Sequence, residues 1–550
     1  METKLQLSRS NVVLYLILIV IISLGLKLYL VDFSLPVNSD NLSYVLNGIA
    51  HSNGDFDHSP SRSIGWSLFL SPFFSLMNSN DFLDYSNVAK IISIGVSTTT
   101  IFLIYKVGRK FFDERYSLVA ACLFAFLPQL NYNSVMALSE PLFIFSILAS
   151  FYFLLNDKSK FIIPALAFVG FSYWIRLNGI IFFLIISLTY ILTFKKSRIF
   201  LRNYGIGLVI FLIIISPILL QKYEQFGDPF YSSYQDKMFS NNYEELISNL
   251  SLNTETSASS YIENNGILDF MYTFFISGIF NSMIMLSKLS FPYIFILIPF
   301  GILFSFRAFD QKSQYTKANW IFILSSIFFM SFILSVVPEK RFLLFLMPFL
   351  VLFSVIPIHR VTEYGLSTFS LSRNQKNTFL VIVIIIVIIL SGLFTLRYEK
   401  LDPVLENEKM DFAQYALENL HGNTLRDFGG STDYINSVIL LDHNNFQDFK
   451  ISSLADDTER SKLAYQEIGV SASNIEDLIL KGEPLNLNYL ISNQHDTFYY
   501  PFVDQVYHNE EQYPYLIKIF DSHEHGYEKL KIKVFEINYE KFSKNFEIKN

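Results

Sequence analysis

The sequence predicts a polytopic α-helical membrane protein with about eleven transmembrane helices and a small extracytoplasmic α/β domain at its C-terminal end. Three observations predict this class. Apolar residues make up 51% of the 550 residues and gather in blocks long enough to cross a bilayer. Clusters of Lys and Arg separate alternate blocks, as cytoplasmic loops of membrane proteins do. The residues after position 396 are polar enough to fold in water.

The first apolar block, Asn11–Val31, contains a single charge, Lys27, and is long enough to cross a hydrocarbon core of about 30 Å. It lacks the small-residue cleavage site of a signal peptide, so we expect a retained anchor. Ten further blocks of this kind follow: Ser86–Val107, Tyr116–Leu130, Glu140–Leu155, Phe161–Ile175, Asn178–Phe194, Tyr204–Gln221, Phe291–Phe306, Trp320–Val337, Phe342–Ile358 and Phe379–Leu396.

The distribution of bases predicts which side each loop faces. With an odd number of spans and a cytoplasmic N-terminus, every Lys/Arg cluster faces the cytoplasm of a multi-pass protein in the cell membrane. This parity requires residues 161–194 to form two short spans that turn at Arg176–Gly179, because a single crossing would leave one cluster outside. The external segments are then Asp32–Tyr85, Asn131–Ser139, Arg176–Gly179, Lys222–Leu268, Pro338–Arg341 and the residues after about Arg397.

The composition changes near residue 397, which divides the chain into a membrane domain, residues 1–396, and an outer domain, residues 397–550. The outer domain has 27 acids and 15 bases, a charge of −12, although the whole chain carries −7. We expect helices at Met410–Leu420 and Asn474–Lys481, and strands at Ser437–Asp442, Asn486–Ser492 and Lys531–Asn538.

One apolar stretch has no clear assignment from the sequence. Leu268–Ser290 is interrupted by Gly278 and Lys288, which is typical of a re-entrant or interfacial segment. The segment before it, up to residue 268, is polar and predicts a loop over the outer face.

Several classes of function are disfavoured. The only cysteine, Cys122, excludes a disulfide within the chain and argues against a cysteine-based metal site. No basic face accompanies a nucleic-acid motif, so nucleic acid is not an expected partner. P-loops, zinc signatures, serine elbows and soluble nucleotide-sugar motifs are absent from the sequence.

The order of several short motifs resembles the GT-C glycosyltransferases, and within them the branch of protein O-mannosyltransferases and lipid A aminoarabinose transferases. The resemblance begins at Asp40, which precedes an amphipathic helical pattern after the first span. It continues through these segments, in the family's order: Arg62-Ser-Ile-Gly-Trp-Ser67, Ser139-Glu-Pro-Leu-Phe143, Trp174-Ile-Arg-Leu-Asn-Gly179, Tyr223-Glu-Gln-Phe-Gly-Asp-Pro-Phe230 and Arg341-Phe-Leu-Leu-Phe-Leu-Met-Pro348. The Arg62 segment departs from the fuller Arg-Pro-Pro-Gly-Tyr-Pro run of many members.

The resemblance implies that Asp40 is the general base, which takes a proton from the acceptor as it attacks an anomeric carbon. An acid before a helix also serves simply as an N-cap for the first backbone amides. The pattern Leu42, Val45, Leu46, Ile49 predicts that helix on the membrane surface.

Glu140 is the second acidic candidate. Ser139, Glu140 and Pro141 form a good helix-entry signature, which is a purely structural interpretation. The resemblance implies instead a second acidic site, where Glu140 orients the acceptor or completes a polar cluster. Topology places Glu140 on the same side as Asp40, at a membrane boundary where carboxylates are costly unless used.

Four bases outside the cytoplasm are candidates for binding the phosphate of a lipid donor: Arg62, Arg176, Lys340 and Arg341. Fixed cations would stabilise the charge that builds up as the sugar–phosphate bond breaks. The ordinary alternative is that long basic side chains at span ends reach out to the lipid head groups.

The resemblance therefore implies a glycosyltransferase that moves a sugar from a polyprenyl phosphate to a glycan, lipid or protein acceptor outside the cytoplasm, with inversion. The lipid bilayer and the lipid-linked donor are the expected partners. No cofactor is predicted, and the need for a divalent metal stays open. The alternatives are an oligosaccharyltransferase on the same scaffold, or a transporter or membrane-anchored binding protein. The first would carry a Trp-Trp-Asp-type motif in the outer domain, where this chain has no Trp. The second would show paired, interrupted spans.

Overall fold

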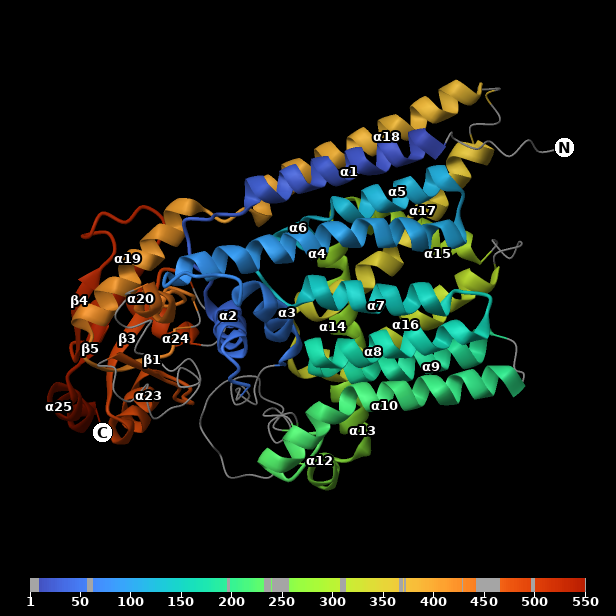
Figure 1. Ribbon diagram of the computed structural model, residues 1–550. Helices are drawn as coiled ribbons and strands as arrows, with labels where there is room; N and C mark the ends of the chain where they lie inside the picture. The colour runs from blue at the N-terminus through green and yellow to red at the C-terminus, as the bar shows by residue number, and fades with distance from the viewer. Residues whose placement is uncertain are drawn as a thin grey trace.

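The computed structural model describes residues 9–56, 63–194, 198–231, 239, 257–306, 313–365, 369, 372–427, 429–441, 465–495 and 500–549. In this part of the chain a long body of helices is joined to a smaller domain built around a β-sheet (Figure 1). The N-terminus lies at one end of the helical body and the sheet domain lies at the other (Figure 1).

The helical body contains the elements α1 to α18. Their bounds are α1 Arg9–Leu30, α2 Ser39–Ser52, α3 Gly65–Phe74, α4 Phe82–Phe111, α5 Glu114–Ala125, α6 Pro128–Val135, α7 Glu140–Leu154, α8 Ile162–Ile175, α9 Ile181–Thr193, α10 Arg198–Phe226, α12 Ala258–Asn265, α13 Ile267–Met271, α14 Ser277–Ser290, α15 Tyr293–Ser305, α16 Ser313–Val336, α17 Met347–Arg360 and α18 Arg373–Phe394. The 3₁₀ segments η1 Ser159–Phe161, η2 Leu177–Ile180 and η4 Lys340–Leu346 lead into α8, α9 and α17.

Among the described residues, seven helical stretches are long and apolar enough to cross a membrane, or eight if the bent pair α5 and α6 counts as one span. The helices α7, α8, α9 and α15 are apolar but shorter. Each of the eleven blocks predicted from the sequence coincides with one of these helices or with the bent pair. The outer faces of α1, α10 and α18 expose many large apolar side chains, as contact with lipid would require.

Residues 161–194 form two short helices, as the positions of the basic clusters predict. Helix α8 ends at Ile175, Arg176 is extended, and η2 then leads into α9. A Cβ at Gly179 would lie 2.4 Å from the backbone of Ser172, so only glycine allows a turn this tight.

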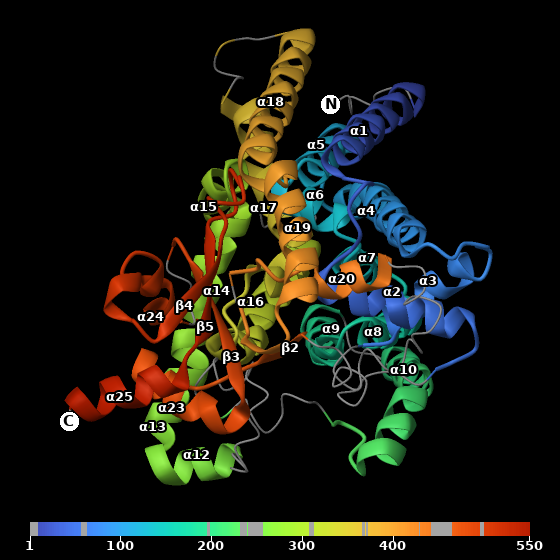
Figure 2. The ribbon, with the colours of Figure 1, turned by 90° about the vertical axis from the view of Figure 1, so that its left-hand side faces the viewer.

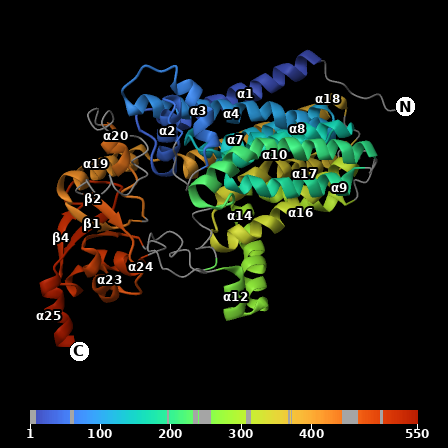
Figure 3. The same ribbon diagram turned by 60° about the horizontal axis from the view of Figure 1, so that its bottom comes forward.

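The stretch Leu268–Ser290, left open by the sequence, is helical in α13 and α14 and is long and apolar enough, from Ile267, to be a candidate span. A crossing here would make the number of spans even, so the topology predicted from the basic clusters requires that this stretch does not cross. It packs directly on α16, because a Cβ at Gly278 would lie 1.9 Å from the carbonyl oxygen of Ser331. Helix α12 precedes it and projects from the helical body (Figure 3).

Helix α17 lies at the centre of the body. Of the most apolar stretch between Lys340 and Tyr364, 89% is buried, more than for any other candidate span. Aromatic rings of α7 and α16 pack against α17. Phe349 stacks on Phe322 with ring centroids 4.0 Å apart, and Phe151 contacts both. This packing fixes η4, which directly precedes α17.

The sheet domain has five strands in the order β2-β1-β3-β5-β4. The strand β1 runs parallel to β2 and β3, whereas β5 is antiparallel to β3 and β4. The bounds are β1 Gly422–Leu425, β2 Tyr465–Ile468, β3 Leu487–Asn493, β4 Leu516–Asp521, β5 Ile532–Ile537, α19 Pro403–Asn419, α20 Ile435–Leu441, α23 Ile475–Gly482, α24 Pro501–Asp504 and α25 Tyr539–Lys549.

Four of the five elements predicted in this domain have the expected type. The prediction of a strand at Ser437–Asp442 is wrong, because residues 435–441 form the helix α20. Short apolar runs fit a strand and a buried helix equally well, so tertiary contacts decide. Here α20 lies against α2 of the helical body (Figure 2), where the Ser437 hydroxyl donates to the carbonyl of Val37 at 2.8 Å.

Candidate functional site

Four segments that are far apart in the sequence meet at the end of the helical body that faces the sheet domain. They are the first turn of α2, the first turn of α7, the turn after α8, and η4. The structure thereby brings together four of the six predicted site residues, Asp40, Glu140, Arg176 and Arg341.

Asp40 stands in the first turn of α2 and is not the N-cap of this helix. Asn38 holds the N-cap position, and the apolar face predicted from the sequence is buried. The preceding residue, Ser39, has φ of 49°, a left-handed conformation that non-glycine residues rarely adopt. Strain of this kind is typical of functional sites.

The Asp40 carboxylate forms an ion pair with Arg341, with Oδ2 and Nη1 2.5 Å apart. Arg341 also contacts the carboxylate of Glu339, which precedes it in the chain. The side chain of Asp40 is 23% exposed and that of Arg341 32%, so both can be reached by a ligand.

Glu140 forms the second ion pair, with Arg176 at 2.6 Å. Arg176 also donates to the hydroxyl of Ser139 at 3.3 Å. The side chain of Glu140 is only 3% exposed, and its Oε2 has no hydrogen-bond partner within the described residues. Glu140 also lines a small pocket that includes the polar side chains of Thr100 and Asn133.

The two ion pairs are linked through Phe342. The guanidinium of Arg341 lies 5.7 Å from the centre of this ring, and that of Arg176 lies 5.4 Å from it. Arg341 also interacts electrostatically with Glu140. On the other side of the cluster, the Ser139 hydroxyl donates to the hydroxyl of Tyr44 at 3.5 Å, one helical turn after Asp40.

An apolar floor of aromatic rings lies beneath the charges. The Arg176 guanidinium lies 6.0 Å from the centre of the Phe143 ring. Phe182 contacts Phe143 and Phe345 edge to face, with centroids 5.5 and 4.6 Å apart. Charges over such a floor are shielded from water on one side, which strengthens their attraction.

Three residues that position this site were not identified from the sequence. Lys90 of α4 is buried and donates to the carbonyls of Asp32 and Leu35 at 2.7 and 2.5 Å, which anchors the segment before α2. A lysine inside an apolar block is costly, and this signal was available in the sequence. Ser437 and Phe342 offered no comparable signal.

Trp66 is a fourth residue that positions this site. Its indole is fully buried and donates to the carbonyl of Ala137 at 2.8 Å. Ala137 has φ of 56° and stands three residues before Glu140. Strained backbone therefore precedes both acids of the site.

Two predicted residues do not contribute to the cluster as described. Arg62 lies outside the residues that the structure describes. Lys340 is exposed at the start of η4. The described residues include no group of three or more His, Cys, Asp or Glu placed to hold a metal ion, and both acids here face arginines.

Comparisons with known proteins give a family match for part of the chain. Residues 64–220 match the model of the dolichyl-phosphate-mannose-protein mannosyltransferase family. This segment contains Glu140 and Arg176, whereas Asp40 and Arg341 lie outside it. A comparison with curated proteins gave no match.

Solved structures with a similar fold include the oligosaccharyltransferase of Archaeoglobus fulgidus in its apo form. The TM-score is 0.57 at 12% identity, over 90% of this chain and 71% of that chain. The same enzyme, AglB, in complex with an inhibitory peptide and a dolichol-phosphate gives 0.53 at 13% identity, over 89% and 70%. ArnT from Cupriavidus metallidurans bound to undecaprenyl phosphate gives 0.47 at 11% identity, over 94% and 97%.

Proposed function

We propose that this chain, which has the fold of the GT-C glycosyltransferases, moves a sugar from a polyprenyl phosphate to an acceptor outside the cytoplasm, with inversion. Asp40 is the general base of this reaction. The observation that carries the proposal is the difference between the two acids. Asp40 is accessible and paired with an arginine whose side chain is 32% exposed, whereas Glu140 is buried beneath the surface.

The ion pair between Asp40 and Arg341 suits a base that becomes active when the donor binds. Before binding, Arg341 neutralises Asp40. A lipid phosphate attracts the guanidinium strongly, because arginine binds phosphate oxygens through two parallel hydrogen bonds. Arg341 then moves from the carboxylate to the phosphate, and Asp40 can accept a proton.

The bonds that form and break in the transfer belong to the two substrates and to Asp40. The acceptor gives its proton to Asp40, and its oxygen or nitrogen forms a bond to the anomeric carbon. The bond from that carbon to the phosphate oxygen breaks, and the electron pair leaves on the lipid phosphate. Arg341, with Arg176 behind it, stabilises the charge on the leaving group. Attack opposite the phosphate gives inversion.

Glu140 and Arg176 position these groups. A carboxylate buried to this degree is stable only when paired, and its partner Arg176 is thereby held beside Phe342 and Arg341. In this proposal Arg62 and Lys340 add positive charge around the donor phosphate. The sheet domain lies outside the membrane and the N-terminus inside, with the membrane domain ending near residue 396.

An oligosaccharyltransferase is the second candidate, since AglB has a similar fold. The chain has Trp only at positions 66, 174 and 320, so the outer domain contains no Trp-Trp-Asp motif. This favours a different acceptor or a smaller sugar.

The experiment that tests the function measures release of polyprenyl phosphate from lipid-linked sugars by the purified protein in liposomes. Lipids carrying one sugar and lipids carrying an oligosaccharide are supplied separately, and products are identified by mass. Sugar transfer or slow hydrolysis of either donor supports the proposal, and the donor preferred separates the two candidates. A folded protein that binds neither donor and cleaves neither contradicts it.

A further inference from the structure

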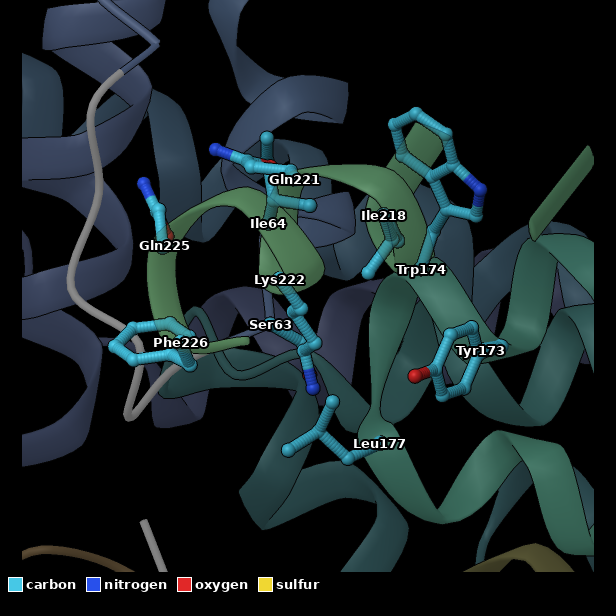
Figure 4. A pocket seen from close by; sticks show the side chains of 10 residues that line it. All are labelled: Ser63, Ile64, Tyr173, Trp174, Leu177, Ile218, Gln221, Lys222, Gln225 and Phe226. Atoms are coloured by element: carbon cyan, nitrogen blue, oxygen red, sulfur yellow. The ribbon is translucent and has the colours of Figure 1, made fainter. Parts of the chain in front are cut away.

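A second pocket lies beside the turn that carries Arg176, on the side away from Glu140. It is formed by the outer ends of α8 and α10 and is closed by Ser63 and Ile64 (Figure 4). Further along the same helices, Gly170 of α8 packs directly against Ile214 of α10.

The wall of this pocket is rigid. A Cβ at Gly65 would lie 2.5 Å from the backbone of Trp174, so the start of α3 and the end of α8 are in direct backbone contact. The Trp174 indole is fixed by donating to the carbonyl of Ile214 at 2.7 Å. A binding site built on such contacts is already formed before a ligand arrives.

Three hydrogen-bond donors face the pocket. Figure 4 shows the Lys222 ammonium between Ser63 and Leu177, with the Tyr173 hydroxyl turned toward the same space. Only 3% of Tyr173 is exposed, and its hydroxyl has no hydrogen-bond partner within the described part of the chain. The Tyr173 hydroxyl is therefore available to donate to, or accept from, a group bound in the pocket.

The charge of the pocket is positive. Lys222 donates to the carbonyl of Tyr231 at 2.7 Å, which leaves two of its three N–H groups for a ligand. Asp228 interacts electrostatically with Lys222, but this carboxylate does not line the pocket and accepts from the amide of Phe230 at 2.8 Å. None of the ten lining residues is acidic.

The remaining walls are apolar, and the pocket lies at the outer end of a helix that exposes leucine and isoleucine along its length. Ile218 lines the pocket, and Leu220 and Ile213 of α10 are largely exposed. An ammonium and two hydroxyls beside such a surface match a phosphate group carried on a hydrocarbon chain.

We propose that this pocket binds the phosphate head group of an anionic membrane lipid, with Lys222 and Tyr173 as its main contacts. The site is separate from the arginines that face Asp40, because Arg176 turns from the shared loop toward Glu140. The ligand chemistry is a lipid phosphate with net negative charge. It can come from a phospholipid of the bilayer or from a polyprenyl phosphate.

The test uses the full-length protein in detergent after removal of lipid, with binding measured by native mass spectrometry. Phosphatidylglycerol and polyprenyl phosphate are the probes, and phosphatidylcholine is the uncharged comparison. The variants are Lys222→Gln and Tyr173→Phe. Lys288→Gln is the matched control, because Lys288 is an exposed lysine on α14 that does not line the pocket.

We expect one saturable anionic lipid, bound roughly tenfold more weakly by Lys222→Gln, since the bonds lost are charge-assisted. Tyr173→Phe weakens binding about threefold and Lys288→Gln leaves it unchanged. If equimolar polyprenyl phosphate displaces phosphatidylglycerol, the pocket binds the polyprenyl phosphate. If it does not, the pocket binds the phospholipid of the bilayer.

The proposal is overturned if Lys222→Gln and Lys288→Gln bind alike, or if phosphatidylcholine binds wild type as tightly as phosphatidylglycerol. Should Lys222→Gln fail to fold, Tyr173→Phe alone decides, because it removes a single oxygen. The assay needs no sugar transfer, so its failure leaves the proposed enzyme activity untouched.

Discussion

The carboxylate of Asp40 and the guanidinium of Arg341 are 2.5 Å apart in space and 301 residues apart in the chain. The two opposite charges are therefore paired at the end of the helical body that faces the sheet domain. The ion pair unites the first external loop with η4, and it is the contact on which a general-base mechanism depends.

Asp40→Asn keeps the size of the side chain and removes the proton acceptor. We expect turnover to fall by roughly 10²–10⁴-fold with donor binding nearly intact, because general-base catalysis contributes a factor of this order. The measurement is transfer rate against donor concentration. Asp40→Ala should be equally inactive and also fold, since Asn38 holds the N-cap position. Transfer at the wild-type rate by Asp40→Asn would make Glu140 the next carboxylate to test.

Arg341→Ala removes the cation that exchanges between Asp40 and the donor phosphate. We expect the KM for the donor to rise by roughly tenfold or more, because an arginine–phosphate contact is charge-assisted. Arg341→Lys keeps the charge and loses the paired hydrogen bonds, so its donor KM should lie between those of the wild type and Arg341→Ala. An unchanged donor KM in Arg341→Ala would exclude this residue from phosphate binding.

Arg176→Ala leaves Glu140 charged and buried without a partner. The loss of stability should be about 3–5 kcal/mol, as for other broken buried ion pairs. Adding Glu140→Gln to Arg176→Ala removes the stranded charge and should restore part of this stability. Thermal unfolding of the two variants in detergent measures the difference. If the double variant is no more stable than Arg176→Ala, the pair is not coupled.

Asp40 and the sheet domain should lie on the outer side of the membrane, and the loop between α7 and α8 on the inner side. In a Cys122→Ala background, Ser39→Cys should react with an impermeant thiol reagent on intact cells, whereas Lys158→Cys should react only after permeabilisation. Both positions are exposed, whereas Ser139 is buried and unsuitable as a reporter. Labelling of both on intact cells contradicts the topology.

Helix α20 links the sheet domain to the loop that carries Asp40. Ser437→Ala removes its hydrogen bond to Val37, and Leu440→Ala opens the apolar cluster that it shares with Leu42 and Val45. We expect a lower kcat with little change in donor KM, because these changes loosen α2 and leave the phosphate contacts in place. Val438→Ala, on a partly buried position of α20, is the control.

A chain ending shortly after Arg397 should still cleave the donor slowly. Complete loss of donor cleavage in folded protein would assign catalytic groups to the sheet domain.

Much of the fold could be predicted because a membrane span is recognised from the composition of a short stretch of sequence. Apolar blocks and alternating basic clusters require only nearby residues, and they predicted the short helices on either side of Arg176. The type of α20 could not be predicted, because its apolar run is as compatible with a strand as with a helix. Its contact with Val37 decides the matter, and that contact is tertiary.

The candidate site was predicted as a set of residues and not as pairs. The motifs singled out both acids and the arginines, but charge and spacing do not say which carboxylate faces which guanidinium. That choice depends on how η4 approaches α2 and how the turn after α8 approaches α7. The same limit applies to Phe342, which contacts both arginines and looks like any apolar residue in the sequence.

Trp66 makes the start of α3 a fixed wall beside the candidate site. Lifting this segment would expose a fully buried indole and break its hydrogen bond to Ala137, at a cost on the order of 4 kcal/mol. Gly65, packed on the backbone of Trp174, leaves no room for the segment to slide instead. In the proposed reaction, an acceptor that approaches Asp40 past the start of α3 therefore meets a surface of fixed shape, so this side of the site selects by fit and not by movement.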